Sequence, residues 1–150
     1  YDVKGKKYFE TPLKYYMADV GLRNARLNFR QVEENHIMEN VIFNELKVRG
    51  YSVDVGVVES KETIDGKRKL KQLEIDFVAN RGSKKYYIQS AYEMPTEEKL
   101  RQEKRSLIKV GDSFKKIVVV KDNIRPQTDE EGIVTMGLIN FLLDQNSLDL

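Results

Sequence analysis

The sequence lacks cysteine and tryptophan altogether, and it has only one histidine and three prolines in 150 residues. Without cysteine there can be no disulfide, no thiolate catalysis and none of the common structural zinc sites. The single histidine, His36, excludes sites that require several imidazoles. No apolar run approaches the roughly 20 residues of a membrane-spanning helix, and no signal peptide is visible. We therefore expect a cytoplasmic protein with no membrane partner.

Charge of one sign is also scarce, because 26 Lys and Arg residues face 24 Asp and Glu residues and the net charge is +2. Such a small excess does not by itself indicate a nucleic-acid-binding protein, so any basic patch has to be local. The phosphate-binding pattern G-x-x-x-x-G-K-[ST] does not occur, and ATP binding by that route is excluded. What remains is an ordinary balance of 40% hydrophobic and 33% charged residues, which is enough for one domain with a core.

Hydrophobic periodicity predicts an alternation of helices and strands. Apolar residues at helical spacing after Asn35, a candidate N-cap, predict a helix over 36–49 that ends at Gly50. The other expected elements are a strand-like run over 14–19, a helical piece from Gly21, strands over 51–60, 69–80 and 84–92 with a turn at Asp65-Gly66, a helix with Pro95 in its first turn, a buried strand over 115–122, and a short strand and helix over 132–144. This order predicts an α/β fold in which helices flank a mixed sheet.

Alternation within the strands assigns side chains to faces. In the strand over 69–80, Glu74 shares a face with Leu70, whereas Leu73, Ile75 and Phe77 share the other. In the strand over 84–92, one face carries Tyr87, Gln89 and Ala91, and the opposite face carries Tyr86, Ile88 and Ser90.

Asp76 and Gln89 occupy positions where chemistry is expected. Hydrolysis of a phosphodiester requires one or two divalent ions held by carboxylates that converge from separate elements, and a lysine usually lies beside the attacking water. Many metal-dependent nucleases place an acid on one strand, and a second acid and a lysine two residues apart on the next. Here Asp76 stands in the first place, but Gln89 and Ala91 stand in the other two.

Other acids can join Asp76 in a metal site. Glu74 is expected beside it on the same strand face, and Glu103 lies on the apolar stripe of the helix after Pro95. Glu39 and Glu45 both lie near the apolar stripe of the helix over 36–49, and periodicity does not choose between them. For each glutamate the competing interpretation is a surface acid paired with a basic residue. The candidate metal ligands are thus Glu39 and Asp76, with Glu74 and Glu103 as further possibilities.

Several segments resemble a known family. "YDVKGKKYFETPLKYYMADVGLRNARL", "MENVIFNELKVRGYSVDVG", "EIDFVA" and "YYIQSAYEM" are similar to the C-terminal domain of unknown function found in a large bacterial and archaeal family of AAA-type ATPases. In that family a P-loop ATPase domain and a winged-helix segment precede this domain. The resemblance implies that residues 1–30 are the tail of the winged-helix segment with a lead-in strand, and that residues 31–150 form the C-terminal domain. It also implies that ATP binds only to the upstream ATPase domain, which would be a partner within the same polypeptide.

The family resemblance further implies a restriction-endonuclease-like, PD-(D/E)XK fold with a three-layer core in the order helix-strand-strand-strand-helix-strand. Carried over by position, the vestigial catalytic residues are Glu39, Asp76 and Gln89. The sequence departs from the nuclease pattern at Ala91, where the lysine is missing unless Lys99 or Arg101 replaces it.

Because a missing transition-state donor costs roughly 10²–10³ in rate, we expect a non-catalytic accessory domain that binds nucleic acid or protein and holds no cofactor. One alternative is a metal-dependent DNA endonuclease, resembling Holliday-junction resolvases, that uses Mg²⁺ or Mn²⁺. A second alternative is a structural module that drives oligomerisation.

Overall fold

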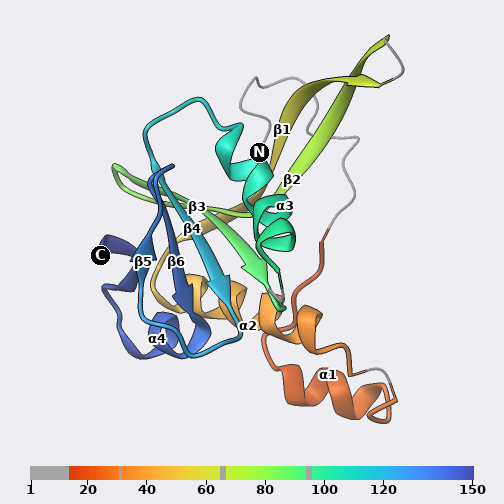
Figure 1. Ribbon diagram of the computed structural model, residues 1–150. Coiled ribbons are helices and arrows are strands. Elements are labelled where there is room, and N and C mark those ends of the chain that lie inside the picture. The colour runs from red at the N-terminus through yellow and green to blue at the C-terminus, as the bar shows by residue number, and fades with distance from the viewer. Residues whose placement is uncertain (1–13, 31, 65–66, 94–95) are drawn as a thin grey trace.

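The computed structural model describes residues 14–30, 32–64, 67–93 and 96–150. A mixed six-stranded sheet with the strand order β1-β2-β3-β4-β6-β5 forms its centre, with helices on both faces (Figure 1). The elements are α1 (Val20–Arg26), α2 (Glu34–Val48), β1 (Ser52–Ile64), β2 (Lys67–Arg81), β3 (Lys84–Ala91), α3 (Glu97–Ile108), β4 (Lys115–Val120), β5 (Gln127–Thr128), β6 (Ile133–Gly137), α4 (Leu138–Leu143) and the 3-10 helix η1 (Ser147–Asp149).

Two apolar clusters, one on each face of the sheet, make the molecule a three-layer α/β structure. On one face α2 and α4 contribute Ile42 and Phe141 to a cluster that contains Phe77 and Ile88 of the sheet. On the other face α3 contributes Leu107 to a second cluster. The predicted fold class is confirmed, and so is the core order, which the structure realises as α2-β1-β2-β3-α3-β4.

Strand β4 is the centre of this sheet and is parallel to both β3 and β6. Its residues Ile117 and Val119 belong to the cluster under α2, whereas Val118 and Val120 belong to the cluster under α3. An apolar run without alternation is typical of a strand that is covered on both faces. The prediction of a buried strand here is confirmed.

Two local predictions need correction. Residues 14–19 form no strand, because the backbone of Met17 bonds to the side chain of Asn40 on α2 rather than to a strand. Helix α2 begins two residues earlier than predicted, at Glu34, with Glu33 at the N-cap position, so Asn35 lies inside the helix. Gly50 follows the helix with φ of +81°, as a helix stop requires. The Asp65-Gly66 turn and Pro95 lie outside the described residues.

A register shift in β2 overturns the predicted assignment of its side chains to faces. Asp54 pairs with Val78 and Gly56 pairs with Ile75, so β2 carries one extra residue between these pairs. As a result Ile75 lies in the cluster under α3 while Phe77 lies in the cluster under α2. Extra residues of this kind bend a strand and redirect its side chains. Asp76 lies at this irregularity.

Helix α1 projects from the body of the protein. Helix α1 has no buried residue, and it lies below and to the side of the sheet (Figure 1). At the opposite side the hairpin of β1 and β2 extends well beyond the other strands. Within the described part of the chain, no helix is both long enough and apolar enough to cross a membrane.

Candidate functional site

Three carboxylates from two elements converge on the ammonium of Lys14. The Lys14 Nζ lies 2.9 Å from Glu39 Oε1, 2.5 Å from Glu74 Oε1 and 3.1 Å from Asp76 Oδ1. Asp76 is the most enclosed of these groups, with 11% of its side chain exposed, and Glu74 is the most open, with 52% exposed. Three of the acids predicted from the sequence thus meet around a cation that the chain itself provides.

The helix and the sheet each hold one side of this acidic cluster, which consists of Lys14, Glu39, Glu74 and Asp76. Helix α2 presents Glu39 toward the sheet, since its buried neighbours Met38 and Ile42 face the core. On β2 the register shift places Asp76 beside β3, where the backbone N–H of Ser90 donates to Asp76 Oδ2 over 2.8 Å. One carboxylate oxygen of Asp76 is therefore fixed by β3, and the other faces Lys14.

Tyr16, two residues after Lys14, also contacts the cluster. Its hydroxyl donates to Glu39 Oε1 over 2.5 Å, and its ring stacks on Phe43 with a centroid distance of 4.2 Å. Burial, and then the hydrogen bond to Glu39, raise the pKa of the Tyr16 phenol. The phenol stays protonated and acts only as a donor to Glu39.

Burial and charge act in opposite directions within the cluster. Burial raises the pKa of Asp76 to about 6, although the Lys14 charge and the Ser90 hydrogen bond oppose that rise. For Lys14, burial alone lowers the pKa, but the charge of Asp76 and the hydrogen bonds to Glu74 and Glu39 outweigh it and raise the pKa above its ordinary value. Lys14 is therefore charged throughout the physiological range and offsets part of the negative charge of the acids around it.

Gln89 lies on the other face of the sheet from Glu39, and its hydrogen bonds go to the backbone of Asp76 and to Glu103. It shares the face of Tyr87 and Ala91, which belong to the cluster under α3, as predicted. Its Oε1 accepts from the backbone N–H of Asp76 at 3.4 Å. It also forms a side-chain hydrogen bond with Glu103, whose pKa burial raises. Gln89 therefore links Glu103 to the backbone of Asp76 and does not reach the Lys14 ammonium.

A divalent ion does not fit the cluster in this arrangement. Mg²⁺ requires oxygen ligands at about 2.0–2.1 Å in near-octahedral geometry. The three oxygens instead stand at hydrogen-bonding distances from a nitrogen that occupies their point of convergence. Among the residues that the structure describes, no group of three or more His, Asp or Glu side chains is placed to hold a metal ion. Of the predicted ligands, Glu39, Glu74 and Asp76 meet, whereas Glu103 contacts Gln89 instead.

The remaining candidates have local partners. Glu45 pairs with Arg49 at 2.8 Å on the same helix, which settles the ambiguity between Glu39 and Glu45. Lys99 lies 3.8 Å from Glu93. Among the described residues it is Lys14 that pairs with Asp76, so Lys99 does not replace the lysine missing at Ala91. Sequence reasoning missed Lys14 and Tyr16. Both lie in the run over 14–19, which the sequence marks only as strand-like.

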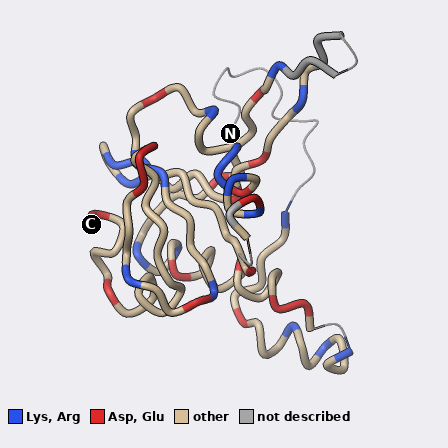
Figure 2. Tube along the Cα trace, viewed as in Figure 1, with Lys and Arg blue, Asp and Glu red and all other residues tan. Residues whose placement is uncertain are grey.

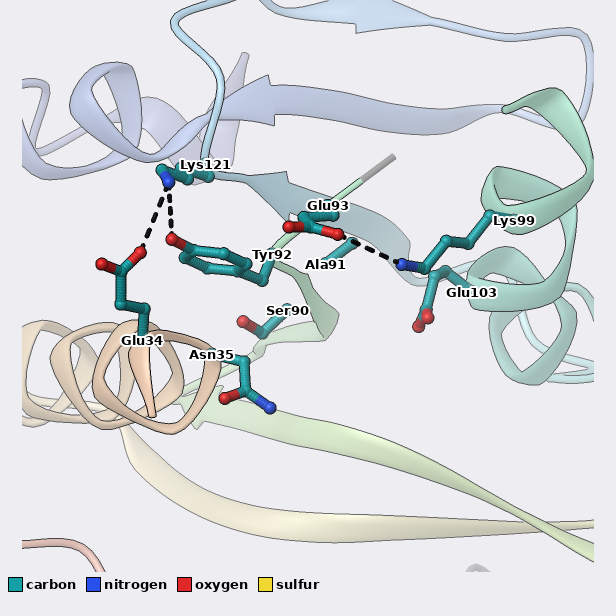
Figure 3. Close-up of a pocket in the computed structure, with 9 residues that line it drawn as sticks. All are labelled: Glu34, Asn35, Ser90, Ala91, Tyr92, Glu93, Lys99, Glu103 and Lys121. Carbon is teal, nitrogen blue, oxygen red and sulfur yellow. Dashed lines mark hydrogen bonds and ion pairs between the residues drawn. The ribbon is translucent and has the colours of Figure 1, made fainter. Parts of the chain in front are cut away.

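A pocket of about 710 Å³ lies next to the cluster, where β3 and β4 end (Figure 3). Lys121 Nζ on one wall donates to the Tyr92 hydroxyl over 2.5 Å and lies 3.4 Å from Glu34. Lys99 and Glu103 of α3 form the opposite wall, and Ser90 and Asn35 lie between the two walls. The pocket is therefore polar, with an ammonium group on each side. Elsewhere acidic and basic residues are interspersed along the trace (Figure 2).

Comparison with known proteins gives one informative relative. A protein of Haemophilus influenzae, described as an uncharacterized protein, is 34% identical to this chain over 143 residues, which is 95% of the chain and 32% of that protein. The chain thus spans about a third of the length of the curated relative that it matches. No protein-family model matches the chain, and no solved structure matches it.

Proposed function

We propose that this chain is a non-catalytic accessory domain with a degenerate restriction-endonuclease-like fold, which binds nucleic acid or protein on behalf of an upstream AAA-type ATPase. The observation that carries the proposal is the Lys14 ammonium at the centre of Glu39, Glu74 and Asp76. An internal salt bridge satisfies the acids that a nuclease would use to hold a divalent ion. The sequence match that spans only a third of a longer relative supports a role as one part of a larger polypeptide.

The face that supports nucleic-acid contact is the pocket beside the cluster. Lys99 and Lys121 stand on its two walls, each loosely paired with a glutamate and each about half exposed. Ammonium groups on the two sides of one pocket suit contact with the phosphates of a nucleic-acid backbone, which bind chiefly by charge and release of counterions. The proposal assigns these two lysines to backbone contact and assigns no base recognition.

Fluorescence anisotropy with branched and linear DNA over a salt series tests this proposal. We expect binding that weakens as salt rises, and we expect Lys99→Glu and Lys121→Glu to weaken it for all sequences and to reduce the salt slope by about one each. Lys109→Glu is the matched control, because Lys109 is exposed at the far end of α3. Absence of binding at low salt removes the nucleic-acid form of the proposal and leaves protein binding.

A metal-dependent DNA endonuclease is the second candidate, and one observation favours it. Lys14 brings an ammonium to Asp76, although the sequence position of the usual lysine holds Ala91. Plasmid and branched DNA incubated with Mg²⁺ or Mn²⁺ test this function. If the site cleaves DNA, Asp76→Ala abolishes the cleavage and Lys14→Met reduces it by roughly 10²–10³. Cleavage that persists with Asp76→Ala comes from a contaminant.

A further inference from the structure

Residues 14–17, which we call the strap, are held to α2 by amide side chains. The backbone N–H of Met17 donates to Asn40 Oδ1 over 2.8 Å, and Asn40 Nδ2 donates to the Met17 carbonyl over 2.7 Å. Asn44 Nδ2 donates to the same carbonyl over 3.0 Å. The strap is thus tied to α2 through the backbone of Met17, which two asparagines satisfy, and it takes no part in the sheet.

Few apolar contacts hold the strap and the helix that follows it. Tyr16 packs against Phe43 and, at 5.9 Å between ring centroids, against Phe77. In contrast, 85% of Tyr15 and 43% of Met17 are exposed, and α1 buries no residue. Segments with few buried apolar contacts open at lower free energy than the core of a sheet. The strap is therefore expected to detach at a low free-energy cost. In contrast, Glu39 lies on α2, and Glu74 and Asp76 lie on β2, and both elements contribute residues to the core.

The same carboxylate oxygens cannot serve the strap and a metal ion together. Glu39 Oε1 accepts from both Lys14 and Tyr16, and Asp76 Oδ1 accepts from Lys14. We infer that the strap is an internal plug: while it is closed, Lys14 excludes divalent cations from Glu39, Glu74 and Asp76, and its withdrawal opens these acids to such a cation. The inference rests on the proposed function, because that proposal takes the cluster with Lys14 in place as the form that holds no divalent ion.

Binding of Mn²⁺ alone, followed by electron paramagnetic resonance, tests the plug without reference to activity or DNA. Lys14→Met should bind Mn²⁺ roughly tenfold or more tightly than the natural chain, because the affinity of a site falls by the fraction of molecules in which it is open. Asp76→Asn introduced into Lys14→Met should remove that gain. Lys61→Met is the matched control, since Lys61 is an exposed lysine of β1, and it should leave Mn²⁺ binding unchanged.

A second variant separates movement of the strap from loss of a charge. Tyr16→Ala keeps Lys14 and all three acids but removes the ring that packs on Phe43, and it should also tighten Mn²⁺ binding. In the natural chain, saturating Mn²⁺ should speed hydrogen exchange at the Met17 amide, whose partner is Asn40 on α2. Equal Mn²⁺ affinity in the natural chain, Lys14→Met and Tyr16→Ala overturns the plug.

The two proposals fail in different ways. Loss of DNA binding in the anisotropy experiment contradicts the nucleic-acid role and leaves the Mn²⁺ result untouched. Mn²⁺ binding that is unaffected by the strap variants, together with an unchanged exchange rate at Met17, contradicts the plug whether or not DNA binds.

Discussion

The ammonium of Lys14 lies 3.1 Å from the carboxylate of Asp76, although 62 positions separate the two residues in sequence. This contact joins the lead-in segment to the middle of β2. It also brings together a residue that sequence reasoning identified as a site residue and one that it passed over. The stability of the domain should therefore depend on the lead-in segment.

Removal of the Lys14 charge should destabilise the fold at neutral pH. Lys14→Met leaves three acids without their cation, and we expect a loss of about 1–3 kcal/mol, at the modest end because Lys14 and Glu74 retain contact with water. Urea unfolding measures the loss. Lys61→Met, at an exposed lysine of β1, should change stability by less than about 0.5 kcal/mol. Equal stability of the two variants would contradict the role assigned to Lys14.

Asp76 should titrate close to neutrality. Carbon NMR of its carboxyl should show a midpoint near the pKa of about 6 that burial produces, and Lys14→Met should move the midpoint higher because it removes the opposing cation. Since this pKa lies above the ordinary value of 3.8, the contribution of Asp76 to stability is present below 3.8 and is lost as pH rises through about 6. Asp76→Asn should remove that part of the pH dependence. A midpoint near 3.8 would show that the carboxylate is well solvated.

The Lys104 and Asp129 pair gives the opposite pH dependence. Lys104 Nζ lies 2.6 Å from Asp129 Oδ2, and the two side chains are 10% and 23% exposed. Although burial raises the pKa of Asp129, the hydrogen bonds from Lys104 and from backbone N–H groups hold it below 3.8. Its contribution is therefore present above 3.8 and is lost as pH falls through the lower, folded-state pKa.

Asp129→Asn tests this pair by urea unfolding at two pH values. We expect a loss of roughly 2–4 kcal/mol at pH 7 and a smaller loss in acid. Glu130→Gln, one residue further on and exposed, is the control and should have little effect at either pH. A loss of the same size at both pH values would contradict the assignment to the ion pair.

Gln89 should resist replacement by the acid that the nuclease pattern would have there. Gln89→Glu removes the amide that bonds to Glu103 and places a second carboxylate beside that partly buried acid. We expect a loss of about 1–3 kcal/mol in urea unfolding and a further rise in the pKa of Glu103. Gln102→Glu, at an exposed position of α3, should be nearly neutral. A stabilised Gln89→Glu variant would show that the site favours an acid after all.

Gly56 should be required opposite the register shift that positions Asp76. A Cβ atom at Gly56 would lie 2.8 Å from Val78 Cγ2 and 3.0 Å from Ile75 Cβ. Gly56→Ala should therefore cost about 1–3 kcal/mol in thermal or urea unfolding, as overpacking does. Gly111→Ala meets nothing within 4 Å and serves as the control. Equal stability of the two variants would show that β1 and β2 adjust freely at this point.

Sequence periodicity was enough to predict the order of the core elements and the faces of β3, because helices and strands of this length repeat at 3.6 and 2 residues. It failed in β2, where the extra residue between the pairs of Asp54 and Gly56 puts Ile75 and Phe77 on opposite faces. No pattern of apolar residues encodes such a shift. Glu39 and Asp76 were identified correctly as neighbours, but the resemblance to a family guided that prediction more than periodicity did.

The identity of the cation in the cluster was beyond prediction for a different reason. Lys14 reaches the acids from a segment without regular structure, and a contact across 62 positions depends on the tertiary fold. Asn40 and Asn44, which hold that segment, lie on α2. The apolar residues of α2 account for its helical pattern, so that pattern gives no indication of what the two asparagines bind. Gln89 and Glu103 were noted separately, and only the packing of α3 against β3 joins them.

Strand β5 has a further consequence for the solution behaviour of this protein. It is two residues long and covers the outer edge of β6, all of whose residues are buried. An uncovered, fully buried strand at the margin of a sheet is a template for pairing with another molecule, and very short edge strands reduce that tendency. Residues 127 and 128 thus protect the edge of β6 from pairing with a strand of another molecule.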